Sequence, residues 1–199
     1  MNRVVIAYDE TVSLCQDCAD VTREASVSVG IDYQLMCADM LTMSNVTDVL
    51  NELDAPNVLT AFSHGTSRGF CNSSQAYYID KDEETGLLYK LTGHMVYAIA
   101  CYSGVDELVG EMLRKGVVAY WGYKDRFVYR KEDGFGDCVT TGLRSMLQGK
   151  CLSEAKQDLL DSLQNYADSC ANDDPVSSGL TLLNKKNLVV EGDDAFVLY

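Results

Sequence analysis

The sequence predicts an α/β fold in which a mainly parallel sheet of about six strands carries helices on both faces. Two observations lead to this prediction. Short apolar runs rich in strand-forming residues recur along the chain, at 3–8, 57–62, 95–100 and 117–122. Segments with apolar residues spaced three or four apart, typical of amphipathic helices, follow several of these runs. Because runs without polar alternation belong to strands covered on both faces, the sheet is expected to be parallel.

In the first half of the chain, each predicted helix carries an apolar stripe and each predicted strand is a short run of apolar residues. Leu14 and Cys18 share such a stripe, and Pro56 marks the start of a strand. The expected elements in order are a strand at 3–8, a helix from near Thr11, a strand at 32–40, a helix from Ser44 or Asn45, and a strand at 57–62.

The second half begins with a predicted hairpin at 76–91, where AYYID and GLLYKL flank a polar turn. A buried strand at 95–100 leads into a helix beginning near Gly104. A strand at 117–122 is followed by a polar, aromatic and glycine-punctuated loop at 123–136. The remaining predicted elements are helices at 135–148 and 153–167, a break at 173–175, and short strands at 188–190 and 195–198.

Two reactive side chains follow neighbouring strands of the predicted sheet. His64 follows the strand at 57–62 after a single serine, and Cys101 comes directly after the strand at 95–100. Adjacent strands lie about 4.8 Å apart, so groups beyond their carboxyl ends meet in one crevice. His64 and Cys101 are therefore a candidate base and nucleophile. A helix beginning near Gly104 would favour the thiolate of Cys101 through its dipole.

The residues around this pair resemble the caspase-like cysteine proteases of clan CD. FSHG at 62–65 and IACYSG at 99–104 are similar to the His-Gly and Ala-Cys motifs of that clan. GVVAYWG at 116–122, Asp125, and GKCLSEA at 149–155 resemble its CHAT branch, bacterial relatives of caspases. Caspases carry Gln two residues before the cysteine, whereas this chain has Ile99. The departure counts against caspase-type cleavage after aspartate.

The resemblance implies a three-layer caspase-like fold and a cysteine endopeptidase with a His64 and Cys101 dyad, without metal or cofactor. The backbone N–H groups of Gly65 and Cys101 would form the oxyanion hole. The substrate pocket would be formed by Ile99, Trp121 and Asp125, and a carboxylate at its floor would favour cleavage of a protein or peptide after a basic residue.

The resemblance also implies control by a sensor or partner protein, as in relatives that act in bacterial defence. Only Arg114, Lys115 and Gly116 separate the helix after Cys101 from the next strand, which leaves no room for the cleavable linker of executioner caspases. We therefore expect a partner to order the segments 123–136 and 76–91.

The composition predicts one globular domain, 1–199, in the cytoplasm. The 199 residues are 47% hydrophobic and 23% charged, and 16 basic against 30 acidic residues give a formal charge of −14. Such an acidic surface disfavours nucleic acids and anionic membranes as direct partners. The eight cysteines are expected to be reduced, because no secretory leader is recognised before Arg3.

The sequence is also compatible with two other functions. A catalytically inactive caspase-like scaffold would keep the fold and only bind partners. The spacing Cys15-x-x-Cys18 is also compatible with a redox protein, although the flanking residues of thioredoxin are missing. His94 precedes its strand and is expected to be structural or exposed, since it lies at the opposite end from Cys101.

Overall fold

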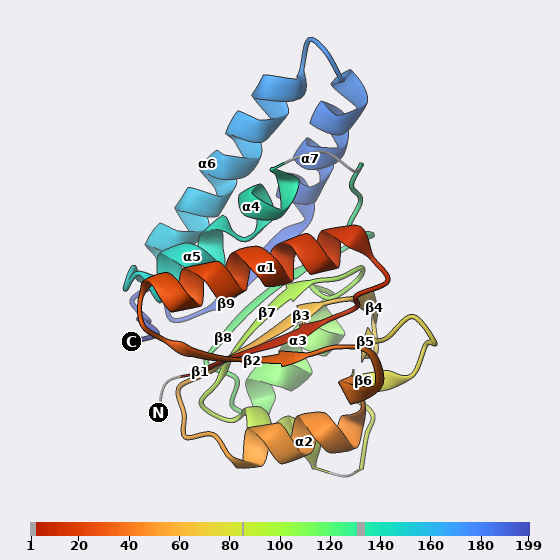
Figure 1. Cartoon of the computed structure of the whole chain (residues 1–199), viewed down its shortest axis with the longest axis vertical. Helices are drawn as coiled ribbons and strands as arrows, with labels where there is room; N and C mark the ends of the chain where they lie inside the picture. The colour runs from red at the N-terminus through yellow and green to blue at the C-terminus, as the bar shows by residue number, and fades with distance from the viewer. Residues whose placement is uncertain (1–2, 85, 131–133) are drawn as a thin grey trace.

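The computed structural model describes residues 3–84, 86–130 and 134–199, and its centre is a six-stranded sheet (Figure 1). The strand order is β2-β1-β3-β7-β8-β9, with β9 antiparallel to β8 and every other pair parallel. The strands are β1 (Arg3–Tyr8), β2 (Asp32–Met36), β3 (Val58–Phe62), β7 (Met95–Ile99), β8 (Ala119–Tyr123) and β9 (Leu188–Gly192). The predicted mainly parallel sheet is confirmed.

Helices cover both faces of the sheet, because successive side chains of each buried strand point to opposite faces. In β7, Tyr97 packs into one apolar cluster with α1, α4, α5 and α6, whereas Val96 packs into another with α2 and α3. Figure 1 shows α7 lying along α6. The helices are α1 (Ser13–Ser28), α2 (Met43–Asn51), α3 (Asp106–Arg114), α4 (Phe135–Val139), α5 (Thr141–Leu147), α6 (Leu152–Cys170) and α7 (Pro175–Asn187).

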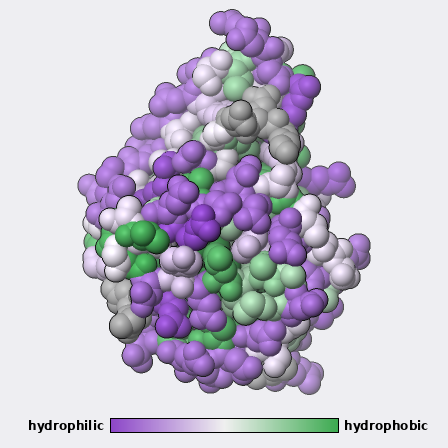
Figure 2. Space-filling view, viewed as in Figure 1, coloured by the Kyte–Doolittle hydropathy of each residue, from purple (hydrophilic) through white to green (hydrophobic). Residues whose placement is uncertain are grey.

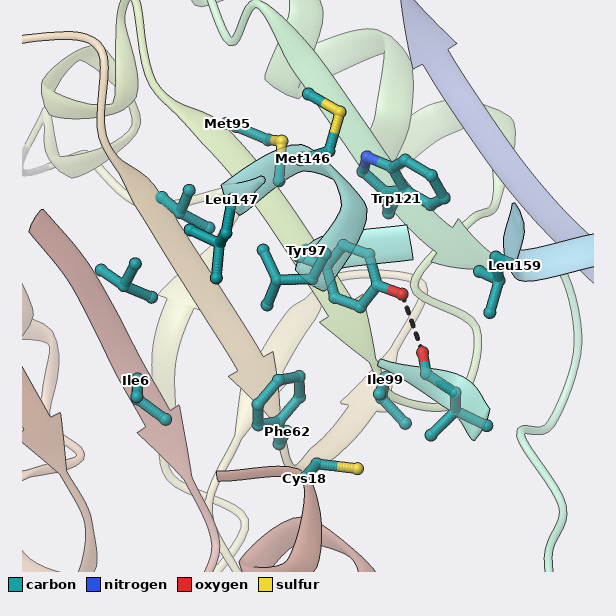
Figure 3. Close-up of a cluster of buried hydrophobic side chains, with 14 of the residues drawn as sticks. Ile6, Cys18, Phe62, Met95, Tyr97, Ile99, Trp121, Met146, Leu147 and Leu159 are labelled. Atoms are coloured by element: carbon teal, nitrogen blue, oxygen red, sulfur yellow. Dashed lines mark hydrogen bonds between the residues drawn. The ribbon is translucent and has the colours of Figure 1, made fainter. Parts of the chain in front are cut away.

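The larger apolar cluster locks α4 onto the sheet through a buried tyrosine. The Tyr97 hydroxyl donates a 2.7 Å hydrogen bond to the Val139 carbonyl (Figure 3). The Tyr97 ring lies 5.1 Å from the ring of Trp121, centre to centre. A polar group of this kind stabilises a core only when it is paired, and here the pairing also sets where α4 sits.

The predicted hairpin at 76–91 is wrong in its second half. The segment β6 (Tyr77–Asp80) pairs antiparallel with β5 (Gly69–Cys71), and β5 pairs with β4 (His64–Thr66) in a separate three-stranded sheet. Leu87–Leu91 forms a 3₁₀ helix, η2, that buries its three leucines. Their spacing fits one face of a helix better than alternate positions of a strand. The turn of the predicted hairpin includes Thr85, which lies outside the described residues.

The C-terminal third differs from the sequence prediction because of local capping. The predicted break at 173–175 is the start of α7: the Asp174 side chain accepts hydrogen bonds from the N–H groups of Val176 and Ser177, and Pro175 occupies the first helical turn. The predicted helix at 135–148 is divided at Thr140 into α4 and α5.

The remaining predicted elements lie close to the observed ones. The strand predicted at 32–40 ends at Met36, and Ala38–Met40 forms a short 3₁₀ helix, η1. The strand predicted at 195–198 is reduced to an isolated bridge between Cys151 and Val197. Residues 124–130 form neither helix nor strand, as predicted for the loop, whose residues 131–133 lie outside the described ones.

The surface seen in Figure 2 is mostly hydrophilic, with apolar side chains in small groups. Within the described residues, no helix combines the length and the apolar composition that a bilayer crossing requires.

The turn that follows β7 packs on β8 through two facing glycines. A Cβ on Gly122 would lie 2.9 Å from the Ser103 carbonyl carbon and 3.0 Å from the Gly104 nitrogen. The Gly104 N–H donates to the Tyr123 carbonyl at 2.8 Å. The Ser103 hydroxyl donates to the Ala100 carbonyl at 2.7 Å and accepts from the Tyr123 N–H at 3.0 Å. The turn carrying Cys101 is thereby fixed to the neighbouring strand.

We expect Gly122→Ala to destabilise the fold by about 1–3 kcal/mol, because the new methyl group would collide with backbone atoms that cannot rotate away. Urea unfolding followed by circular dichroism measures the change. Gly110→Ala on α3 is the matched control: its Cβ meets nothing within 4 Å, and the helix should gain about 0.5–1 kcal/mol. Equal stability of the Gly122→Ala variant and the parent chain would contradict the tight approach.

Candidate active site

Strand register brings His64 and Cys101 to the same level of the sheet. Phe62 at the end of β3 is paired with Ile99 at the end of β7. His64 and Cys101 each come two positions beyond this pair, on adjacent parallel strands. His64 is exposed and begins β4, whereas Cys101 is half-buried. The predicted meeting of the two side chains at one edge of the sheet follows from this pairing.

Gly65 lies directly against the backbone of Cys101. A Cβ on Gly65 would lie 2.5 Å from the Cys101 carbonyl oxygen and 2.8 Å from the Ala100 Cβ. A distance of 3.3 Å separates the same position from the Cys101 nitrogen. Only a residue without a side chain allows the His64 strand to approach this closely, which holds the histidine beside the cysteine.

A cavity of about 160 Å³ opens between these strand ends. His64 and Cys101 both line it, and so does Ile99, one of the residues predicted for the substrate pocket. The other lining residues, mostly apolar, are Val12, Leu14, Cys15, Ser63, Ala100, Phe127 and Tyr129. A thiol and an imidazole on the wall of one mostly apolar cavity are an arrangement that could support covalent catalysis.

The backbone turns sharply immediately after Cys101. Tyr102 has a φ of 55°, a left-handed conformation that costs free energy in a non-glycine residue and is common near functional sites. Its N–H donates to the Asp125 carbonyl at 3.0 Å. The helix α3 begins only at Asp106, so the prediction that Cys101 sits at a helix N-terminus is wrong. The turn, not the helix, presents the thiol.

Trp121 and Asp125, both predicted for the substrate pocket, lie outside the cavity. Trp121 is 1% exposed, and a Cβ on Gly142 would lie 2.8 Å from its ring, so the indole belongs to the core shown in Figure 3. Asp125 is exposed, and its carboxylate accepts a 2.7 Å hydrogen bond from the Arg126 N–H. Because alternate residues of β8 face opposite sides of the sheet, Trp121 packs into the larger apolar cluster and Tyr120 into the other.

Asp9, which the sequence analysis did not single out, is a buried carboxylate whose negative charge acts on Cys15 in the cavity wall. It is 3% exposed, and its N–H donates to the Phe62 carbonyl at 2.9 Å. Oδ1 accepts from the Thr11 N–H and hydroxyl, whereas Oδ2 has no hydrogen-bond partner among the described residues. Asp9 also lines a second cavity, of about 200 Å³, with Glu10, Thr11, Ala38, Asp39, Leu41, Asn72, Ser73 and Ser74.

A signal for Asp9 was present in the sequence. The residue follows the first strand closely, as His64 and Cys101 follow theirs, and the three strands are neighbours in the sheet. The segments around it, however, come from 38–41 and 72–74, which line the same cavity as Asp9 and which the sequence alone does not place together.

Three buried thiols, of which Cys15 lines the cavity, are held in the neutral form. Burial, and then the negative charge of Asp9, raise the pKa of Cys15 to about 12. Burial raises the pKa of Cys18 well above its ordinary value and that of Cys138 to about 11. Because thiolates carry redox reactivity, these shifts disfavour the redox function considered for Cys15 and Cys18. Within the described residues, no group of three or more His, Cys, Asp and Glu is placed to hold a metal ion.

The chain matches no protein-family model and no curated protein. Among solved structures, the crystal structure of the Arg-specific cysteine proteinase gingipain R is similar to 99% of this chain, with a TM-score of 0.64 and 13% sequence identity. The chain spans 47% of that gingipain chain. The likeness confirms the three-layer caspase-like fold predicted from the sequence.

At about pH 7.5, iodoacetamide should alkylate Cys101 before Cys15, Cys18 and Cys138, because only a thiolate reacts and burial raises the pKa of the latter three. Peptide mass spectrometry after brief labelling identifies the modified residue. His64→Ala should slow the labelling of Cys101. Preferential labelling of Cys15 and Cys18 would instead support a redox protein.

Proposed function

We propose that the chain is a cysteine endopeptidase in which Cys101 is the nucleophile and His64 is the acid and base. The observation that carries this proposal is the shared cavity: both side chains line it, and they follow adjacent parallel strands in register. Gly65 supports the pairing, because its missing side chain lets the two strand ends approach.

The reaction proceeds through an acyl-enzyme. His64 takes the proton of the Cys101 thiol, and the sulfur attacks the scissile carbonyl carbon and forms a C–S bond, while the carbonyl oxygen takes the negative charge. The backbone N–H groups of Gly65 and Cys101 hold that oxygen. His64 protonates the leaving amine as the C–N bond breaks, then removes a proton from the water that hydrolyses the thioester.

The same proposal gives the enzyme a preference for a basic residue before the cut. The Asp9 carboxylate is buried with one oxygen unpartnered among the described residues, and its charge reaches Cys15 on the cavity wall. A guanidinium or ammonium would compensate that buried charge. Neither Asp9 nor Asp125 lines the cavity that contains Cys101. Asp9 suits this role better, because it is buried and its charge acts on Cys15 in the wall of that cavity, whereas Asp125 is exposed. Gingipain R, whose fold is similar, is an Arg-specific proteinase.

We place the enzyme in the CHAT-type branch of the caspase-like clan, in the cytoplasm, acting in bacterial defence on a protein substrate under control of a sensor or partner. The motifs at 116–122 and 149–155 and the formal charge of −14 support this part of the proposal. An acidic protein attracts basic peptides and repels nucleic acids and anionic membranes.

Cys101→Ala should abolish peptide hydrolysis while leaving the fold intact, because it removes only the sulfur. Turnover of a fluorogenic peptide library measures the activity, and the unfolding midpoint in urea checks the fold. Cys170→Ala, at the far end of α6, is the control and should hydrolyse peptides like the parent chain. Hydrolysis by the Cys101→Ala variant of any peptide that the parent cuts would rule out the assigned nucleophile.

Asp9→Asn should lower kcat/KM for peptides with arginine before the cut by on the order of 10²-fold, since it removes a buried charge partner at constant size. The same substitution at exposed Asp125 is the matched control and should change kcat/KM less than about threefold. A large loss of kcat/KM in Asp125→Asn, with none in Asp9→Asn, would indicate that Asp125 and not Asp9 binds the basic side chain. Preference of the parent chain for aspartate would refute the basic pocket and leave the dyad standing.

A further inference from the structure

The side-chain amide of Asn184, on α7, forms hydrogen bonds with both the N–H and the carbonyl of Val128, a loop residue beside the active site. Asn184 is 0% exposed. Its Nδ2 donates a 2.6 Å hydrogen bond to the Val128 carbonyl, and its Oδ1 accepts a 3.1 Å bond from the Val128 N–H. Val128 belongs to the segment 124–130, which forms neither helix nor strand. The Asn184 side chain therefore supplies the pairing that a neighbouring strand would otherwise give.

The residues on either side of Val128 form part of the active-site wall. Phe127 and Tyr129 both line the cavity that contains His64 and Cys101. The Phe127 carbonyl oxygen lies 3.7 Å from the Cys101 sulfur, where it accepts the thiol hydrogen. The Phe127 ring also packs edge-on against Tyr123, with their centres 4.6 Å apart. Asn184 itself does not line the cavity, so it acts on Cys101 only through this segment.

We propose that Asn184 is a positioning residue of the Cys101 site, which holds the Phe127 carbonyl against the thiol and so keeps the nucleophile protonated until the segment is displaced. A carbonyl oxygen stabilises a thiol by accepting its hydrogen, but it repels a thiolate. The proposal rests on the function proposed for Cys101. It adds a restraint on the nucleophile that is built into the chain, from a helix that the sequence did not predict.

Several other groups face Cys101 and must be separated from this effect. His64 comes from β4 and Cys15 from α1, two elements that contain neither Asn184 nor Val128. Arg126 interacts electrostatically with Cys101 and donates through Nε to the Tyr102 hydroxyl at 3.2 Å. His64 and Cys15 keep their places in an Asn184 variant, because they lie on other elements. Arg126 and Tyr129 belong to the same segment as Phe127 and move with it. Loss of the Arg126 cation would raise the midpoint of the Cys101 profile, so a fall in the midpoint reports the loss of the carbonyl contact.

The test measures the rate of Cys101 alkylation by iodoacetamide as a function of pH, with site-resolved peptide mass spectrometry. In Asn184→Ala we expect the midpoint of the profile to fall by about one pH unit, so that alkylation at pH 7 rises on the order of tenfold. Simple exposure of the sulfur would instead raise the plateau at high pH and leave the midpoint in place.

Asn57→Ala is the matched control. Asn57 is also 0% exposed, and its side chain accepts from the Arg3 N–H and donates to the Asp54 carbonyl at the opposite end of β3. This variant also loses a buried side-chain amide, but one at the opposite end of β3 from the site. The midpoint of its Cys101 alkylation profile should therefore equal that of the parent chain. If Asn184→Ala does not fold, Asn184→Leu decides, because it nearly keeps the side-chain size and removes both hydrogen bonds to Val128 without adding a charge, so the same fall in the midpoint is expected.

An unchanged midpoint in the folded Asn184 variant, or an equal shift in Asn57→Ala, would overturn the proposal. The same labelling data also test the His64 and Cys101 dyad, independently of the Asn184 effect. If His64→Ala leaves Cys101 alkylation unchanged both in the parent chain and in the Asn184→Ala background, the dyad fails, whereas the Asn184 shift is still measurable.

Discussion

The parallel pairing of β3 with β7 is the constraint on which the site depends. It places Phe62 opposite Ile99 and thereby sets His64 and Cys101 at one level beyond the strand ends. Gly65 lets the strand that carries His64 lie against the Cys101 backbone, because there is no room for a side chain next to the Cys101 carbonyl. A shift of the register by one residue would move the two reactive groups apart and turn each buried strand residue to the wrong face.

The presentation of the thiol depends on a second set of contacts, between the turn after β7 and the end of β8. Ser103 joins the two segments through its hydroxyl, while Gly104 and Gly122 allow the backbones to touch. From there the chain continues into the segment that Asn184 fixes to α7. Because each buried polar group in this region is costly when unpaired, the hydrogen bonds act together to define one arrangement.

Charge is the basis of the proposed substrate preference. The chain carries a formal charge of −14, and the negative charge of the buried Asp9 carboxylate acts on Cys15 in the cavity wall. In the proposed function, the overall charge raises the local concentration of cationic peptides, whereas the buried carboxylate selects the basic side chain. The two proposed effects act over different distances and favour the same class of substrate.

The sequence by itself determined the parallel strands, most helices and the placement of His64 and Cys101. These features depend on local patterns: apolar runs, helical spacing, and which residue directly follows a strand. Tertiary structure alone decided that Asp9 is buried, that Trp121 lies in the core and that Asp125 is exposed. It also brought Asn184 to Val128, fifty-six positions apart in the chain. Burial and hydrogen-bond partners are set by distant segments packing together, and a local pattern carries no information about them.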